Sequence, residues 1–301
     1  MEVKMINYNI RKNKETEEIC MSNGIINVIA VPKQGGRILE YSINGLNVLY
    51  RNEELIGKNN DINKERTAEN WMNFGGYKGW PAPQTVWQWP PVFDIDQNTF
   101  SYEIKKSEKS IELKLISRIS ETKPIQGLQF IRTITLYDNS SDMYVQETIV
   151  NHSEKAVQWA VWDNTQVLSP GFAEIKLNSN VFTGGITFYQ DFDIPSSNAY
   201  SIRKEDRKIL TINCNRKEKF KIGVVTDSGE VSYKCTAYDN DIILKKKFMY
   251  EGQVVYPHGS NIEVYADTTL PYAELEILGG MKKIEPNKSI SLKVNWNLSM
   301  W

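Results

Sequence analysis

Two glutamates near the carboxyl end of the chain have the spacing that acid–base chemistry on a strand requires. In the run PYAELEIL, Glu274 and Glu276 are separated by one residue, and apolar residues alternate with them. Because successive side chains of a strand point to opposite faces, the two carboxyl groups share one face. Each should raise the proton affinity of the other if that face is enclosed. The pair is therefore a candidate for proton transfer. The alternatives are ion pairing to Arg37, Lys78 or Arg132, and exposure to solvent.

The run from Trp71 to Pro91, WMNFGGYKGWPAPQTVWQWPP, holds four tryptophans, three glycines and four prolines. Prolines remove backbone donors and glycines permit unusual backbone angles, so the run is predicted to be stiff and irregular. Flat indole faces such as those of Trp80 and Trp89 suit the CH-rich faces of sugar rings. The pattern predicts a carbohydrate-binding surface. The alternative is that these tryptophans only close one end of a β-sandwich.

Other reactive side chains are few. Arg37, in GGRIL, is suited to hold an acidic sugar or a phosphate, or to pair with a neighbouring acid. The two histidines, His152 and His258, fall in the turns NHS and YPHGS and are expected to be exposed turn residues rather than acids. No HxH, HxxxH or calcium-loop spacing occurs, and GGYKGW lacks the glycine spacing of a phosphate loop. The sequence therefore predicts neither a metal nor a cofactor.

The elements that position these residues are predicted to be consecutive strands. Short runs rich in Ile, Val, Tyr and Thr are broken by Asn, Gly, Asp and Ser, which is typical of an all-β fold. The predicted strands are 24–31, 37–43, 46–50, 99–105, 110–118, 129–137, 143–151, 156–163, 208–213, 219–225, 230–238, 241–248, 260–267, 272–278 and 289–297. The one predicted helix is 60–70. No linker interrupts the series, so we expect one extended sandwich over 1–301, with 1–20 as an added terminal segment or edge strand.

Composition excludes several classes of partner. The chain has 301 residues and a formal net charge of -1, which gives no electrostatic footprint for nucleic acid or an anionic membrane. Three widely spaced cysteines indicate free thiols, and no run approaches the ~20 apolar residues of a membrane span. The first residues lack a secretory signal, so a cytoplasmic location is expected, although a removed leader would leave no trace. The oligomeric state stays open.

Several runs together resemble a known family. These are VPKQGGRILEYSINGLNVLY, GGYKGWPAPQ with WPP, VNHSEKAVQWAVWDNTQV, IEVYAD, YAELEILG and the final strand ending in VNWNL. The chain resembles an uncharacterised bacterial family of the galactose mutarotase-like group from about residue 31 to residue 298, more weakly between 170 and 255. The resemblance implies a β-supersandwich whose concave face binds a mono- or oligosaccharide.

The resemblance also implies site residues. Aldose 1-epimerases of this group open a sugar's hemiacetal ring with a histidine acid and a glutamate base. Glu276, in LEILG, matches the base, and Glu274 is the second choice. The Gly-Trp-Pro run is similar to a sugar-contacting loop of related epimerases, which implies that Lys78, Trp80 and Gln84 contact the substrate.

One departure from the family pattern bears on activity. Where those epimerases carry the catalytic histidine, this chain reads WAVWDNTQ, which places Trp162, Asp163 and Gln166 there instead. Asp163 or His258 would then have to supply the acid, and Asp163 would need burial to raise its pKa. Asp163 and Glu276 across a cleft would also suit a glycosidase. Two hypotheses follow: a mutarotase or epimerase, and a carbohydrate-binding protein that has lost its acid.

Overall fold

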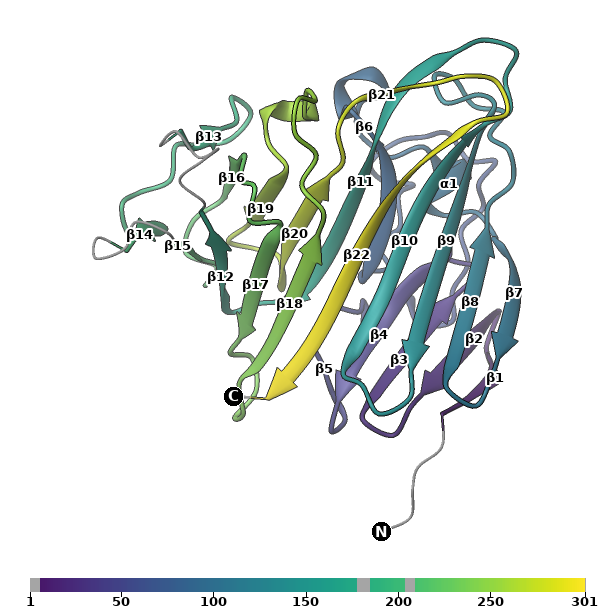
Figure 1. Cartoon of the computed structure of the whole chain (residues 1–301), viewed down its shortest axis with the longest axis horizontal. Helices are drawn as coiled ribbons and strands as arrows, with labels where there is room; N and C mark the ends of the chain where they lie inside the picture. The colour runs from purple at the N-terminus through teal and green to yellow at the C-terminus, as the bar shows by residue number, and fades with distance from the viewer. Residues whose placement is uncertain (1–5, 178–184, 204–208, 301) are drawn as a thin grey trace.

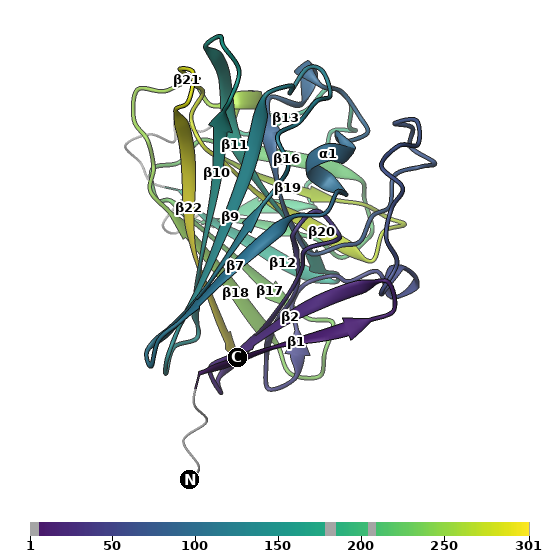
Figure 2. The ribbon, with the colours of Figure 1, turned by 90° about the vertical axis from the view of Figure 1, so that its right-hand side faces the viewer.

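Two large antiparallel sheets face each other and make up nearly all of the fold (Figure 1, Figure 2). The computed structural model describes residues 6–177, 185–203 and 209–300. The galactose mutarotase-like β-supersandwich expected from the sequence is therefore confirmed in its all-β class and its two-sheet architecture.

The first sheet carries the residues that matter most for function. Its hydrogen-bonded order is β1-β2-β3-β4-β6-β11-β20-β19-β16-β13, with β5 beside β4 and β21 beside β11. Its strands are β1 (Asn7–Asn13), β2 (Thr16–Ser22), β3 (Ile26–Val31), β4 (Arg37–Ile43), β5 (Leu46–Asn47), β6 (Tyr77–Ala82), β11 (Val157–Leu168), β13 (Thr187–Phe188), β16 (Phe220–Val224), β19 (Ile262–Ala266), β20 (Tyr272–Leu278) and β21 (Lys282–Ile284). Strand β11 lies in the middle, between β6 and β20, although those two neighbours are far apart in the sequence (Figure 1).

The second sheet packs against the first and supplies the other half of the core. Its order is β14-β15-β12-β17-β18-β22-β10-β9-β8-β7. Its strands are β7 (Ser101–Lys106), β8 (Ser110–Ile116), β9 (Leu128–Tyr137), β10 (Asp142–Asn151), β12 (Gly171–Lys176), β14 (Tyr200–Ile202), β15 (Ile209–Asn213), β17 (Glu230–Cys235), β18 (Ile242–Phe248) and β22 (Ser289–Met300). Alternate residues of its central strands are buried, as a half-buried strand requires.

In residues 6–177, 185–203 and 209–300, helical structure is confined to four short segments: α1 (Phe93–Asp96), η1 (Glu53–Leu55), η2 (Gln84–Val86) and η3 (Pro257–Gly259). Within the described residues, no helix has the length and apolarity needed to cross a membrane. The predicted helix at 60–70 is wrong. Side chains there bond to the local backbone, since Asp61 accepts from the Asn63 N–H at 3.1 Å and Asn70 donates to the Glu65 carbonyl at 3.0 Å. Such bonds compete with the helical pattern.

The tryptophan-rich run is only partly irregular, which corrects the prediction. Residues Tyr77–Ala82 form β6, and its partner β11 places Val161 opposite Pro81. On its other side β6 pairs with β4 only through Tyr77 and Ile38. Strand β4 does not pair with β6 at Pro81, so no hydrogen bond to β4 is lost through the missing N–H of the proline. A proline can therefore occupy this position in the sheet.

Most other predicted strands are confirmed within a few residues at each end, and the first residue of the predicted strand 208–213 lies outside the described part. Strand β11 is the important difference, because it continues to Leu168 rather than ending at Asp163. No strand was predicted at β12, β13, β14 or β21, and residues 7–22 form β1 at the edge of the first sheet and β2 next to it. Edge pairing of that kind covers β3, which would otherwise expose its backbone groups.

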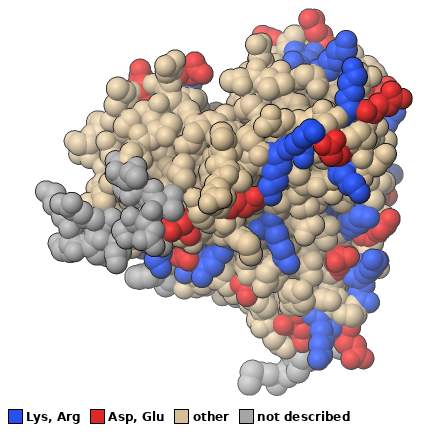
Figure 3. All heavy atoms as spheres, turned by 45° about the horizontal axis from the view of Figure 1, so that its top comes forward, with Lys and Arg blue, Asp and Glu red and all other residues tan. Residues whose placement is uncertain are grey.

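Two buried ion pairs lie between the sheets, within a core that is mainly apolar. Arg132 Nε donates to Glu147 Oε2 at 2.8 Å, and Lys246 pairs with Asp163. Gly79 of β6 lies directly over the Glu147 side chain, and a Cβ there would collide with that carboxyl group. Only glycine therefore lets β6 lie over this charged cluster. On the molecular face in Figure 3, acidic and basic side chains are interspersed rather than gathered by sign.

Candidate functional site

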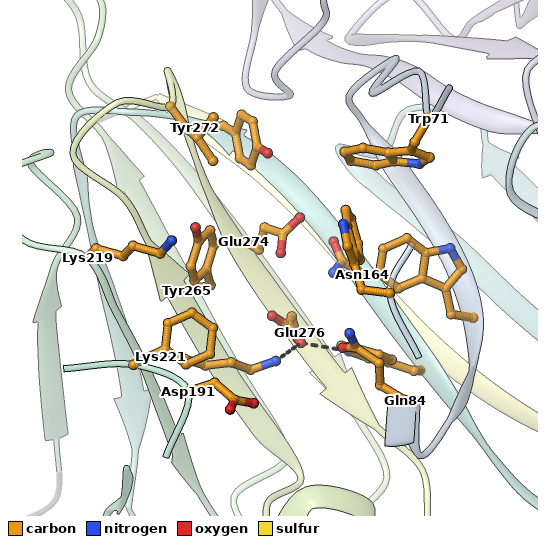
Figure 4. Close-up of a pocket in the computed structure, with 15 residues that line it drawn as sticks. Trp71, Gln84, Asn164, Asp191, Lys219, Lys221, Tyr265, Tyr272, Glu274 and Glu276 are labelled. Carbon is orange, nitrogen blue, oxygen red and sulfur yellow. Dashed lines mark hydrogen bonds and ion pairs between the residues drawn. The ribbon is translucent and has the colours of Figure 1, made fainter. Parts of the chain in front are cut away.

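A pocket of about 540 Å³ opens on the face of the first sheet that points away from the second sheet. Its floor comes from β6, β11, β20, β19 and β16, and its walls come from the flanking loops (Figure 4). The lining residues are Trp71, Trp80, Gln84, Trp89, Trp162, Asn164, Asp191, Phe192, Lys219, Lys221, Tyr265, Leu270, Tyr272, Glu274 and Glu276. The indole-rich run and the paired glutamates, which are nearly 200 residues apart in the sequence, therefore meet in one hollow.

Cross-strand pairing arranges the polar floor in two rows. In the first row, Lys78 stands opposite Asn164, Asn164 opposite Glu276, and Glu276 opposite Glu263. In the second row, Gln166 stands opposite Glu274, and Tyr265 follows on β19. Directly opposed residues in antiparallel strands have their Cβ atoms about 5 Å apart. The register therefore brings side chains from four strands into mutual contact.

Glu276 lies at the centre of this floor. Its side chain is 1% exposed, and its Oε2 accepts hydrogen bonds from Trp162 Nε1 at 2.7 Å and Lys221 Nζ at 2.9 Å. Burial raises the pKa of Glu276 to about 8, the charges of Glu263 and Glu274 act in the same direction, and Lys221 opposes them. A carboxyl group with that pKa exchanges its proton near neutral pH, as acid–base catalysis requires.

The neighbouring carboxyl groups are held ionised. Glu274 accepts from Lys78 Nζ at 3.1 Å and from Gln166 Nε2 at 2.8 Å. Burial alone would raise the pKa of Glu274, but Lys78 and Gln166 outweigh burial and lower it. In the same way burial opposes ionisation of Glu263, yet Lys221 and His258 lower its pKa to about 2. Adjacent carboxyl groups with separated pKa values are a common arrangement where acid and base roles are divided.

Lys221 lies between the carboxyl groups of Glu263 and Glu276, and it was not among the predicted site residues. Its Nζ lies 2.7 Å from Glu263 Oε2 and 2.9 Å from Glu276 Oε2, and it also lies 4.9 Å from the centroid of the Trp162 ring. Burial would lower the pKa of Lys221, but the two glutamates outweigh burial and raise it. The strand pattern of KFKIGV contained a signal, because buried Phe220 and Ile222 flank Lys221 and direct it to the other face.

Asn164 is a second residue that the sequence reading missed. It lines the pocket beside Glu276, and both its amide oxygen and its amide nitrogen are buried without a hydrogen-bond partner among the described residues. Buried polar atoms are nearly always paired in native proteins, so an exception calls for an explanation. A ligand hydroxyl is one group that would pair with both atoms.

One buried carboxylate orients the aromatic wall. Asp96 Oδ1 accepts from Trp80 Nε1 at 2.9 Å and from Arg37 at 2.7 Å, and its Oδ2 accepts from Trp71 Nε1 at 2.8 Å. The hydrogen bonds to Asp96 therefore fix the orientation of both indoles in the pocket wall. Arg37 is fully buried in this network and does not line the pocket, so its prediction as a substrate contact is corrected: it pairs with an acid.

His258 is not the exposed turn residue that we expected. Its side chain is 12% exposed, and its ring lies 5.0 Å from the Trp162 ring at a steep angle. The backbone N–H of Gln84 donates to His258 Nε2 at 3.2 Å, and His258 Nδ1 lies 3.2 Å from Glu263 Oε1. Both ring nitrogens are therefore occupied, which fixes Nδ1 as the protonated position in this arrangement.

Asp163 lies on the wrong face of its strand for the predicted role. Because side chains alternate along β11, Trp162, Asn164 and Gln166 face the pocket side whereas Asp163 faces the second sheet and pairs with Lys246. Burial raises the pKa of Asp163, against the effect of Lys246. The expectation that Asp163 and Glu276 share a cleft is wrong, and with it the glycosidase arrangement.

The other predicted site residues do come together. Glu276, Glu274, Trp80, Gln84, Trp89 and Trp162 all line the pocket. Lys78 and Gln166 lie beside it and bind Glu274, and His258 lines an adjoining hollow. No group of three histidine, cysteine, aspartate or glutamate side chains in the described ranges is placed to hold a metal ion.

Solved structures share this architecture at low sequence identity. A galactose mutarotase-like protein from Clostridium acetobutylicum is 11% identical with a TM-score of 0.61, and the match covers 100% of both chains. A candidate aldose 1-epimerase from Klebsiella pneumoniae is 11% identical with a TM-score of 0.62, and the match covers 97% of this chain and 83% of the other. A galactose mutarotase-like protein from Lactobacillus casei is 9% identical with a TM-score of 0.57, covering 94% and 100%.

These likenesses establish the fold that the sequence resemblance implied. A search of curated proteins found no match to the chain. The family described as a domain of unknown function, DUF4380, matches residues 16–299. Because that match spans nearly the whole chain, the protein belongs to the DUF4380 family and has the galactose mutarotase-like fold.

Proposed function

We propose that this protein binds an uncharged aldose in the pocket above Glu276 and interconverts its anomers by opening and reclosing the sugar ring. The observation that carries the proposal is the Glu276 carboxyl group, buried at the floor of an indole-walled pocket with a pKa raised to about 8. Pockets of this size with aromatic walls and a few convergent polar groups are typical of small-molecule sites.

Glu276 is the proposed general base. It takes the proton of the anomeric hydroxyl while the bond between the anomeric carbon and the ring oxygen breaks, which leaves an open-chain aldehyde. Rotation about the next carbon–carbon bond and reclosure give the other anomer. A base must be unprotonated, so we expect the mutarotation rate to rise with pH through about 8. A pH–rate profile that is flat from pH 6 to 9 would contradict this role.

Lys221 is the proposed proton donor to the ring oxygen, in place of the predicted Asp163. The anomeric and ring oxygens share one carbon atom, so the acid and the base must lie close together, and Lys221 Nζ lies 2.9 Å from Glu276 Oε2. Glu276 is one of the two charges that raise the pKa of Lys221. When Glu276 takes a proton it loses that charge, so Lys221 becomes a better acid at the moment the ring oxygen needs a proton.

The cations of the pocket indicate an uncharged sugar. Lys78 pairs with Glu274, Lys221 pairs with Glu263 and Glu276, and Lys219 lies 3.6 Å from Asp267. Each lysine of the described site therefore already has a carboxylate partner. A sugar phosphate or uronic acid would have to displace one of these partners, whereas neutral hydroxyl groups add to the existing network.

A second candidate function is binding without catalysis. The observation in its favour is His258, whose two ring nitrogens are both engaged, by Gln84 and by Glu263. The pocket histidine is therefore not available as an acid in this arrangement. If Lys221 also keeps its proton throughout, the pocket would hold a sugar without opening its ring.

One-dimensional NMR of freshly dissolved α-glucose and α-galactose tests both candidates. Wild-type protein is expected to speed the approach to anomeric equilibrium, and Glu276→Gln is expected to abolish the acceleration. Glu285→Gln, at an exposed position paired with Lys283, is the matched control and should keep it. Saturable shifts of the sugar signals without acceleration would select the binding function. Neither acceleration nor binding with any aldose would overturn the proposal.

A further inference from the structure

A second hollow of about 580 Å³ adjoins the pocket above Glu276. The two hollows share Gln84, Trp89, Asp191, Phe192 and Lys221 as lining residues, so they are continuous. Each lies within the range of about 300–1,000 Å³ that holds a small-molecule ligand. A single sugar over Glu276 would therefore leave the second hollow open to a further group attached to it.

Trp89 stands between the two hollows with an unusual exposure. Trp89 is 47% exposed, whereas Trp80 and Trp162 in the same wall are nearly buried. Trp71 packs edge-on against Trp89, with ring centroids 4.7 Å apart, which holds the exposed ring in place. An exposed, oriented indole at the mouth of a pocket is a stacking surface for an apolar ring face.

The rest of the second hollow has the chemistry of a neutral polar ligand. Tyr189 and Phe192 supply further aromatic surface, and Thr85, Gln84 and Gln88 supply hydroxyl and amide groups. The charged lining residues are Lys221, which is held by Glu263 and Glu276, and Asp191, whose carboxylate can accept hydrogen bonds from sugar hydroxyl groups. His258 also lines this hollow. Aromatic faces combined with amides and hydroxyl groups match the alternating CH faces and hydroxyl groups of a sugar.

We propose that the second hollow is a subsite for a second sugar residue, so that the natural ligand is the reducing end of a neutral oligosaccharide. This inference rests on the proposed function. The reducing residue lies over Glu276, because ring opening needs a free anomeric hydroxyl group. The next residue, attached through another hydroxyl of that sugar, stacks on Trp89 in the second hollow.

Isothermal titration of the full chain with glucose, maltose, cellobiose and lactose tests the subsite. At least one disaccharide is expected to bind tenfold or more tightly than glucose. Thr85→Arg places a long side chain in the second hollow, where Asp191 can pair with it, and Thr85 is not part of the first pocket. This variant should lose the disaccharide advantage and keep its affinity for glucose within about twofold.

Val86→Arg is the matched control, because Val86 is 49% exposed and lines neither hollow. It should bind every sugar as the wild type does. Equal affinities for glucose and all three disaccharides would overturn the subsite and leave the proposed function intact. A disaccharide advantage that survives Thr85→Arg would also overturn it. Failure of all four sugars to bind would instead overturn the proposed function on which the subsite depends.

Discussion

The buried Glu276 makes the protein's stability depend on pH in a direction that can be calculated. Its folded pKa of about 8 lies above its ordinary value of 4.5. Between those values the folded protein holds a proton that the unfolded chain has released, so stability falls as pH rises. The difference is about 3.5, and each pKa unit corresponds to about 1.4 kcal/mol. Glu276 therefore contributes up to about 5 kcal/mol that is fully present below pH 4.5 and lost as pH passes 8.

Glu276→Gln removes this titration and keeps the shape of the side chain. We expect the free energy of unfolding of the wild type to fall from pH 5 to 9 more steeply than that of the variant, by as much as about 1.4 kcal/mol per pH unit. Urea denaturation followed by tryptophan fluorescence at five pH values measures both slopes. Glu263→Gln distinguishes the effect of Glu263 on stability from that of Glu276. Burial opposes ionisation of Glu263, but its partners hold its pKa near 2. The stability that Glu263 contributes is therefore lost only as pH falls below 4.5. Parallel wild-type and Glu276→Gln curves would refute the reasoning.

Three further substitutions test other parts of the structure. Lys246→Met leaves the buried Asp163 without its cation and should cost about 3–5 kcal/mol in urea denaturation; a cost below 1 kcal/mol would contradict the pairing. Asp96→Asn removes the charged acceptor of the Trp71 indole and should weaken sugar binding and shift tryptophan emission; unchanged emission and affinity would argue against it. Asn164→Leu removes two unpaired buried polar atoms, so the free energy of unfolding should stay the same or rise by about 1–3 kcal/mol, while sugar binding weakens. A large loss of stability would show that the amide is already paired.

The predictions from sequence succeeded where a local pattern decides the outcome. Period-two alternation in PYAELEIL is a property of the strand itself, and Glu274 and Glu276 do share a face. The tryptophan-rich run predicted an aromatic surface, and the pocket has one. The same alternation places Asp163 opposite to Trp162. The prediction for Asp163 failed because it followed the family resemblance at this position and not the alternation along β11.

Other site residues depend on contacts that no local pattern contains. Lys221 reaches Glu276 only because β19 lies between β16 and β20 and the register places the two side chains diagonally across it. Arg37 faces inward because Asp96, from a turn 59 residues later, is its partner. The sequence left both roles of Arg37 open, since an arginine on a strand can bind a ligand or pair with an acidic side chain of the protein.

The sequence by itself determined that the chain is all-β and which side chains along each strand share a face. It also identified indoles and paired carboxyl groups as the main groups available for binding and proton transfer. Those properties follow from backbone geometry and side-chain type within a few residues. Tertiary structure decided which faces enclose a pocket, which carboxyl group keeps a cation and which is buried with like charges. Strand order and register set those distances, and the pKa of Glu276 depends on burial, on Lys221 from β16, on Glu263 from β19 and on Glu274 from its own strand.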